Sequence, residues 1–284
     1  MEIKEINKLV RRIKEEPSVL FLGQDYLKSY DGCDVFMEAV RSNGNSWQSG
    51  SGYSGIWENY SQNQEMGEES LRKLVDARNT IPMQKWLRGL LSMKWGMVIT
   101  SSIDGVMQHC TGENFDLDTI NYDKKNFNVE YMNKKTLHAS FLYGTIDGDK
   151  NLYPPKTCDA KALRALRKRV KDRIGWIYNH ALCGYGVLII DGWNPETDWA
   201  DFLLEDASDM PYGSIYIFGI DVQTAQQNTT ISGLVEDGIA CIEEKSLAFV
   251  LKESSYFEKE AELEMAMESQ GNVRTVTLKD AKGR

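Results

Sequence analysis

Short, unbroken runs of apolar residues recur along the chain, separated by longer segments in which apolar residues fall every three or four positions. Unbroken runs of this length are typical of strands covered on both faces, and the longer spacing is typical of amphipathic helices. The runs that predict strands are 19–22, 95–100, 136–143, 187–190, 214–218 and 239–242. Their alternation with helices predicts an α/β fold, a Rossmann-like parallel sheet with helices on both faces.

The segments with helical spacing are 3–13, 34–40, two helices within 68–94, 159–182, 198–206 and one that begins at 246. Residues 34–94 form a helical and loop insertion after the first strand. Within it, 42–67 is rich in Gly, Ser and Asn and is predicted to be a long surface loop or lid. This loop holds four aromatic residues, which is unusual for a simple linker: Trp47, Tyr53, Trp57 and Tyr60.

A chain of 284 residues with 42% hydrophobic content can bury a full core. We expect one domain over 1–255, which includes the N-terminal helix. Residues 256–284 have the pattern of a helix and a strand, and we expect them to begin a further domain.

The net charge of −9 gives no overall basic field for nucleic acid or an anionic membrane. No apolar run is long enough to span a bilayer, and the charged residues 1–16 do not form a signal peptide. The five cysteines are scattered and form no CxxC motif, which indicates reduced thiols and argues against a zinc cluster or a disulfide framework. A cytoplasmic protein is therefore expected.

Glycines and polar residues follow four of the predicted strands. In an open parallel sheet the carboxyl ends of the strands meet at one edge, where ligands bind. We therefore expect a single site to form from four distant segments: 23–25, 100–104, 143–145 and 191–194.

Two of these segments also have a structural explanation. Gly23 lacks the GxGxxG fingerprint of dinucleotide-binding dehydrogenases, and a plain strand-to-loop glycine explains it better. The hydroxyls and carboxylate of 100–104 suit a ribose or a phosphate-bearing ligand, and they suit a helix cap equally well. None of His109, His138 and His180 has a neighbour at metal-ligand spacing, so no metal site is expected.

The segment 161–173 (KALRALRKRVKDR) is the one strong basic cluster. Its side chains suit contacts with the phosphates of nucleic acid or of another ligand. Because the charges lie opposite the leucines, a solvated helix face is the simpler explanation.

The order of the strand-end motifs is more specific than any single motif. VLFLGQDYL, VITSSIDG, FLYGTIDGD, GVLIIDGWNPETDWADFL and SIYIFG follow one another in an order that resembles the SIR2-like (sirtuin-fold) domains of bacterial anti-phage defence proteins. The resemblance covers about residues 17–252. In that family the corresponding strands end in Gly-Ala-Gly, in Thr-Thr-Asn-x-Asp, in His-Gly and in Gly-Tyr-Ser followed by Asp.

The positions that match these motifs are Gly23, Thr100, Asp104 and Gly144, with a looser fit at Gly192 and Asp198. Gln24 and Asp25 replace the alanine and the second glycine. Ser102 stands at the asparagine position, and Tyr143 stands at the histidine position.

The resemblance implies a domain that binds NAD and hydrolyses it to nicotinamide and ADP-ribose in antiviral defence. It also implies a homo-oligomer that works with a C-terminal ATPase or sensor region or with a partner protein. The catalytic roles would fall to Ser102, Asp104 and Tyr143. The residues implied to bind NAD are Gly23, Gln24, Asp25, Tyr26, Thr100, Ser101, Gly144, Gly192 and Asn194.

The two departures weaken the expected catalysis. A serine at 102 cannot supply the paired donor and acceptor of an amide. The phenol of Tyr143 is a poorer general base at neutral pH than an imidazole. Two hypotheses follow: an active NAD hydrolase, or a catalytically degenerate module for nucleotide binding, oligomerisation or sensing within a larger defence protein.

Overall fold

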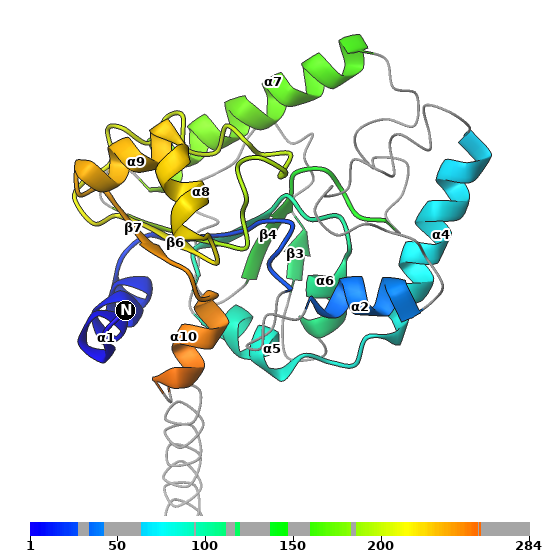
Figure 1. Cartoon of the computed structure of the whole chain (residues 1–284), viewed down its shortest axis with the longest axis horizontal. Helices are drawn as coiled ribbons and strands as arrows, with labels where there is room; N and C mark the ends of the chain where they lie inside the picture. The colour runs from blue at the N-terminus through cyan, green and yellow to red at the C-terminus, as the bar shows by residue number, and fades with distance from the viewer. Residues whose placement is uncertain are drawn as a thin grey trace, which may run out of the picture.

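The computed structural model describes residues 1–27, 34–42, 64–93, 95–111, 117–119, 137–146, 160–182, 186–254 and 256. Within them, seven parallel strands form one sheet in the order β3-β4-β2-β1-β5-β6-β7 (Figure 1). The strands are β1 (Ser18–Leu22), β2 (Met97–Thr100), β3 (Leu117–Thr119), β4 (Leu137–Phe141), β5 (Val187–Asp191), β6 (Ile215–Phe218) and β7 (Ala240–Glu243). The predicted Rossmann-like α/β fold is confirmed.

The strand order reverses at β1. The chain passes from β1 to β2 and β4 on one side of the sheet and then returns to β5, β6 and β7 on the other. The register aligns the strand ends, because Leu22 pairs with both Thr100 and Asp191, and Asp191 pairs with Phe218. The carboxyl ends therefore form one level edge, with the reversal beside β1, where open α/β sheets bind ligands.

Helices cover both faces of the sheet (Figure 1). The helices are α1 (Ile3–Glu15), α2 (Val35–Ser42), α4 (Gln64–Thr80), α5 (Lys85–Ser92), α6 (Val106–Thr111), α7 (Ala160–Trp176), the π-helix η3 (Ile177–Ala181), α8 (Val222–Gln227), α9 (Thr229–Glu236) and α10 (Leu247–Glu253). In the view of Figure 1, α7, α8 and α9 lie above the strands, and α1, α5 and α10 lie below them. This double cover explains why every residue of β1, β2 and β5 is buried. In the described part of the chain, no helix has the length and apolar character needed to cross a membrane.

The insertion predicted at 34–94 contains α2, α4 and α5 in its described part. Helix α4 begins at Gln64, so helix replaces the last residues of the predicted loop. Residues 43–63, with the four aromatic residues of that loop, lie outside the described residues. So do 257–284, which hold most of the predicted C-terminal helix and strand.

The helix predicted at 198–206 is wrong, because these residues form a series of turns. Several carbonyl oxygens that a helix would use accept hydrogen bonds from distant side chains instead. Trp193 Nε1 donates to the Ala200 carbonyl at 3.0 Å, Tyr178 OH donates to the Leu203 carbonyl at 2.7 Å, and Tyr143 OH donates to the Trp199 carbonyl at 2.8 Å. Tertiary hydrogen bonds thus override the local amphipathic pattern.

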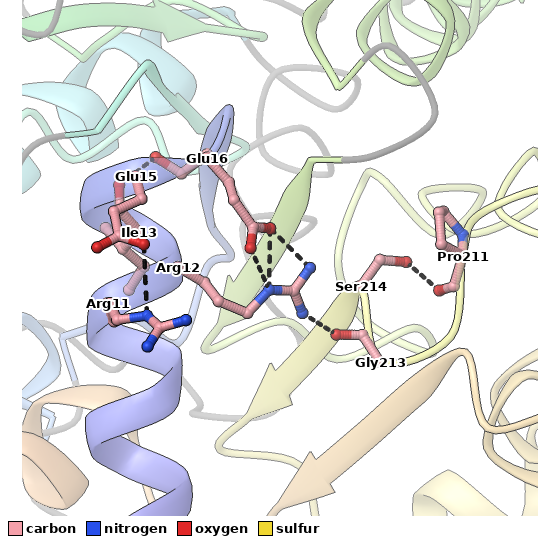
Figure 2. A network of polar contacts seen from close by, with 9 residues as sticks. Arg11, Arg12, Ile13, Glu15, Glu16, Pro211, Gly213 and Ser214 are labelled. Carbon is pink, nitrogen blue, oxygen red and sulfur yellow. Dashed lines mark hydrogen bonds and ion pairs between the residues drawn. The ribbon is translucent and has the colours of Figure 1, made fainter.

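Helix α1 is tied to the sheet by Arg12 (Figure 2). Arg12 Nε donates to both carboxylate oxygens of Glu16, at 3.0 and 2.9 Å, and Nη1 donates to the carbonyl of Gly213, just before β6. In the described part of the chain, the side chain of the neighbouring Arg11 makes only an exposed ion pair within the helix, with Glu15 at 3.3 Å. The same helix therefore carries one arginine that joins two elements and one that does not.

We expect Arg12→Ala to lower the free energy of unfolding by about 1–3 kcal/mol, because the change leaves the Gly213 carbonyl and the Glu16 carboxylate without their charged donor. The matched change Arg11→Ala should cost less than about 0.5 kcal/mol, since its ion pair is exposed. Urea unfolding of the two variants measures both values. Equal losses would contradict the role assigned to Arg12.

Candidate functional site

The four segments predicted to form a site meet at the carboxyl edge of the sheet, and hydrogen bonds join them either directly or through residues 198 and 199. The turn after β1 contacts the turn after β5. Gly23 N–H donates to the carbonyl of Asp191 at 2.9 Å, and Asp25 N–H donates to the carbonyl of Gly192 at 2.8 Å. These bonds continue the pairing of β1 and β5 beyond the last strand residues.

The two turns lie so close together that glycine is required at both contact positions. A Cβ on Gly23 would lie 2.2 Å from the carbonyl oxygen of Gly192. A Cβ on Gly192 would lie 2.2 Å from the backbone nitrogen of Tyr26, and the φ of Gly192 is +66°. The close contact between the two turns therefore explains Gly23. This agrees with its interpretation from the sequence as a plain strand-to-loop glycine.

The corner after β2 is held by its own hydroxyls. Thr100 Oγ1 donates to the carbonyl of Leu22 at 2.8 Å and accepts from Ser102 N–H at 2.9 Å. The Asp104 carboxylate accepts from the Ser102 hydroxyl, from Tyr26 OH at 2.9 Å and from Val106 N–H at 2.7 Å. Because Val106 is the first residue of α6, Asp104 satisfies a free donor at that helix start while it also bridges to the turn after β1.

Asp198 connects this corner to the turn after β1. Its Oδ2 accepts from Gln24 N–H at 2.9 Å and from the Ser101 hydroxyl at 2.8 Å, and its Oδ1 accepts from Ala200 N–H at 2.9 Å. Burial raises the pKa of the Asp198 carboxyl to about 6, although its hydrogen bonds to Ala200, Gln24 and Ser101 act in the opposite direction.

The corner after β4 contacts Trp199, the residue that follows Asp198. Tyr143 OH donates to the Trp199 carbonyl at 2.8 Å, and the two rings meet edge to face with centroids 5.0 Å apart. Gly144 continues the turn with a φ of +75°. Residues 198 and 199 therefore join three of the strand ends. The apolar pattern predicted a helix for this segment, and Asp198 was identified only by its loose match to a motif of the SIR2-like family.

Asn194 has a local role. Its Oδ1 accepts from Glu196 N–H at 2.9 Å, and its carbonyl accepts from Thr197 N–H and Asp198 N–H at 3.2 and 2.8 Å. These bonds shape the turn that carries Asp198 to the edge.

The residues predicted to be catalytic are closed off from solvent. Ser102 is 2% exposed, Asp104 1% and Tyr143 4%. The predicted NAD-binding residues that reach the surface, each half-buried, are Gln24, Asp25, Gly144 and Asn194. A ligand at this edge would meet the second set first.

At this edge, three buried side-chain atoms have no hydrogen-bond partner among the residues that the structure describes: Nε2 and Oε1 of Gln24, and Oδ2 of Asp191. The other oxygen of Asp191 accepts from Leu247 N–H at 3.2 Å. Burial raises the pKa of the Asp191 carboxyl to about 7.

Among the residues that the structure describes, no group of three or more His, Cys, Asp or Glu side chains could hold a metal ion. His109 is exposed, and its Nε2 lies 3.2 Å from the carbonyl of Ile81. The side chains of His138 and His180 lie outside the described residues.

The basic face of α7 carries ion pairs to the turns that follow Asp198. Arg167 pairs with Asp201 at 2.7 Å, and Lys171 pairs with Glu205. These acidic partners offset part of the positive charge of α7. Contact with nucleic-acid phosphates would depend on that charge.

No protein-family model matches the chain, and no curated protein matches it significantly. Any function proposed for the chain therefore depends on the geometry of the site and on the resemblance of its motifs.

We expect Asp198→Ala to lower the free energy of unfolding by about 2–4 kcal/mol, because it leaves three donors from three chain positions unpaired. Amide hydrogen exchange at Gln24 should accelerate in the same variant. Asp201→Ala, which removes an exposed ion pair on the neighbouring turn, should cost about 0–1 kcal/mol and leave Gln24 exchange unchanged. Slow Gln24 exchange in Asp198→Ala would argue against the bridge.

We expect Asp191 to make stability fall as pH rises. The carboxyl titrates near pH 4 when unfolded and at about 7 when folded, so the folded state binds the additional proton. Its contribution is therefore complete below about pH 4 and is lost towards about pH 7. Urea unfolding at several pH values should show a flatter profile for Asp191→Asn than for the wild type or for Asp209→Asn, which changes an exposed carboxylate. Parallel profiles for all three proteins would contradict the assignment.

Proposed function

We propose that the chain is a SIR2-like domain that binds NAD at the carboxyl edge of its sheet and hydrolyses it as an effector of anti-phage defence. One observation supports this proposal: four polar strand ends meet at the carboxyl edge of the sheet, beside the point where the strand order reverses. Dinucleotides bind at this point in open α/β sheets.

The half-buried residues of the edge suit the polar groups of a dinucleotide. Asp25 has a carboxylate that suits a ribose diol, and Gln24 has an amide that a ligand would reach once its two polar atoms are uncovered. Gly23 does not offer the close backbone approach that dehydrogenases give to a pyrophosphate, because the Gly192 carbonyl fills the space beside it. The phosphates would therefore contact another part of the edge.

In the proposed reaction the bond between the nicotinamide nitrogen and C1′ of the ribose breaks, and water adds to C1′. The products are nicotinamide, ADP-ribose and a proton. Asp104 would stabilise the positive charge that develops on the ribose, and Ser102, held by Asp104, would orient the water or a ribose hydroxyl. Tyr143 would lie beside the bond between the nicotinamide nitrogen and C1′.

A second candidate is a degenerate SIR2-like module that binds a nucleotide, oligomerises or senses without hydrolysis. The observation that favours it is the closure of the predicted catalytic residues. The hydroxyls of Ser102 and Tyr143 donate to groups of the protein itself, and both residues are almost fully buried. Hydrolysis would require this part of the edge to open.

One experiment separates the two candidates: calorimetric NAD binding and nicotinamide release, measured on the same purified protein. The first candidate predicts binding and release in the wild type. It predicts that Ser102→Ala and Asp104→Asn each reduce release about 10²–10³-fold and change affinity only a few-fold. Ser208→Ala, at an exposed serine, should match the wild type.

Binding without release in the wild type would reject the first candidate and support the second. The double change Ser102→Ala, Tyr143→Phe should then leave phage protection intact. Absence of both binding and release would reject NAD as the ligand. Thermal unfolding of each variant checks that a loss does not reflect misfolding.

A further inference from the structure

The backbone of Gln24 is held from both sides. Its own N–H donates to Asp198 Oδ2 at 2.9 Å. The N–H of Gly23 before it and the N–H of Asp25 after it donate to carbonyls of the turn after β5, at 2.9 and 2.8 Å. The point from which the Gln24 side chain leaves the backbone is therefore fixed.

In the described part of the chain, the end of that side chain has no hydrogen-bond partner: both Nε2 and Oε1 of Gln24 are removed from solvent, and neither atom bonds to another described residue. Burying an amide in this way is costly, and buried polar groups are nearly always paired. Asp191, whose Oδ2 also has no partner among the described residues, can reduce its cost by taking up a proton. A glutamine amide cannot, so the described residues leave this cost uncompensated, and a bound ligand would supply the missing partner.

We propose that the Gln24 amide is the group with which this edge recognises its ligand, and that the ligand presents a planar edge with adjacent hydrogen-bond donor and acceptor atoms. Two observations support this independently: the unpaired amide, and the position of Gln24 in the turn where the strand order reverses. The inference depends on the proposed NAD binding and assigns a specificity determinant to it.

Such an edge occurs at both ends of NAD. Adenine offers its exocyclic N6–H₂ as donor beside a ring nitrogen as acceptor, and glutamine side chains pair with it through two hydrogen bonds. The carboxamide of nicotinamide offers the same combination. Either end would satisfy both atoms of Gln24.

The test compares the wild type with Gln24→Met, which keeps the unbranched shape and removes both hydrogen-bonding atoms. We expect the Kd for NAD, measured by calorimetry, to rise about tenfold to a hundredfold. The melting temperature without ligand should rise, because the unpaired buried amide has gone, and the stabilisation by NAD should shrink. Gln227→Met, at an exposed glutamine of α8, should match the wild type in all three quantities.

Two analogues identify the recognised end. Nicotinic acid adenine dinucleotide lacks the carboxamide donor, and nicotinamide hypoxanthine dinucleotide lacks the N6 donor. The analogue changed at the recognised end should bind the wild type at least about tenfold more weakly than NAD. In Gln24→Met that difference should disappear, as in a double-mutant cycle.

The outcomes distinguish this inference from the proposed function. NAD binding that is equal in the wild type and in Gln24→Met overturns the inference and leaves the proposed function standing. Discrimination between the analogues that persists in Gln24→Met also overturns it. A wild type that binds no NAD overturns both.

Discussion

The carboxylate of Asp198 is the interaction on which the arrangement of the sheet edge depends. Beyond the strands, backbone hydrogen bonds join the turn after β1 to the turn after β5, and side-chain hydrogen bonds bring in the turns at 198–206. One oxygen of Asp198 accepts from the turn after β1 and from the corner after β2, and the adjacent carbonyl of Trp199 accepts from the corner after β4. Because a buried carboxylate requires donors, the three strand ends and the turns at 198–206 constrain one another.

This arrangement divides the edge into a closed part and an open part. In the closed part, Ser102, Asp104 and Tyr143 are bonded to the protein and almost fully buried. The open part contains half-buried residues, among them Gln24, whose amide is itself removed from solvent and has no partner among the described residues. Binding of a nucleotide needs only the Gln24 amide to become accessible, whereas hydrolysis needs a rearrangement of the closed part. The two candidate functions differ in this one requirement.

Sequence analysis recovered the sheet well, because an unbroken apolar run has few structural solutions when helices cover both faces. Each predicted strand corresponds to an observed one. The edge strand β3 was missed because its three residues, LDT, are too short to form a pattern. The helix predicted at 198–206 failed for a different reason: its apolar spacing is genuine, but its carbonyls bond to Trp193, Tyr178 and Tyr143, which the local pattern does not include.

By itself, the sequence determined most of the residues that form the sheet and which polar residues stand at the strand ends, since burial imposes a local period on the chain. Only the tertiary structure decided which of those polar residues face one another. Asp198 and Gln24 are 174 positions apart, and neither has a neighbour in sequence that reveals the pairing. The unpaired Gln24 amide is likewise visible only in three dimensions, because whether a polar atom has a partner depends on every segment packed around it.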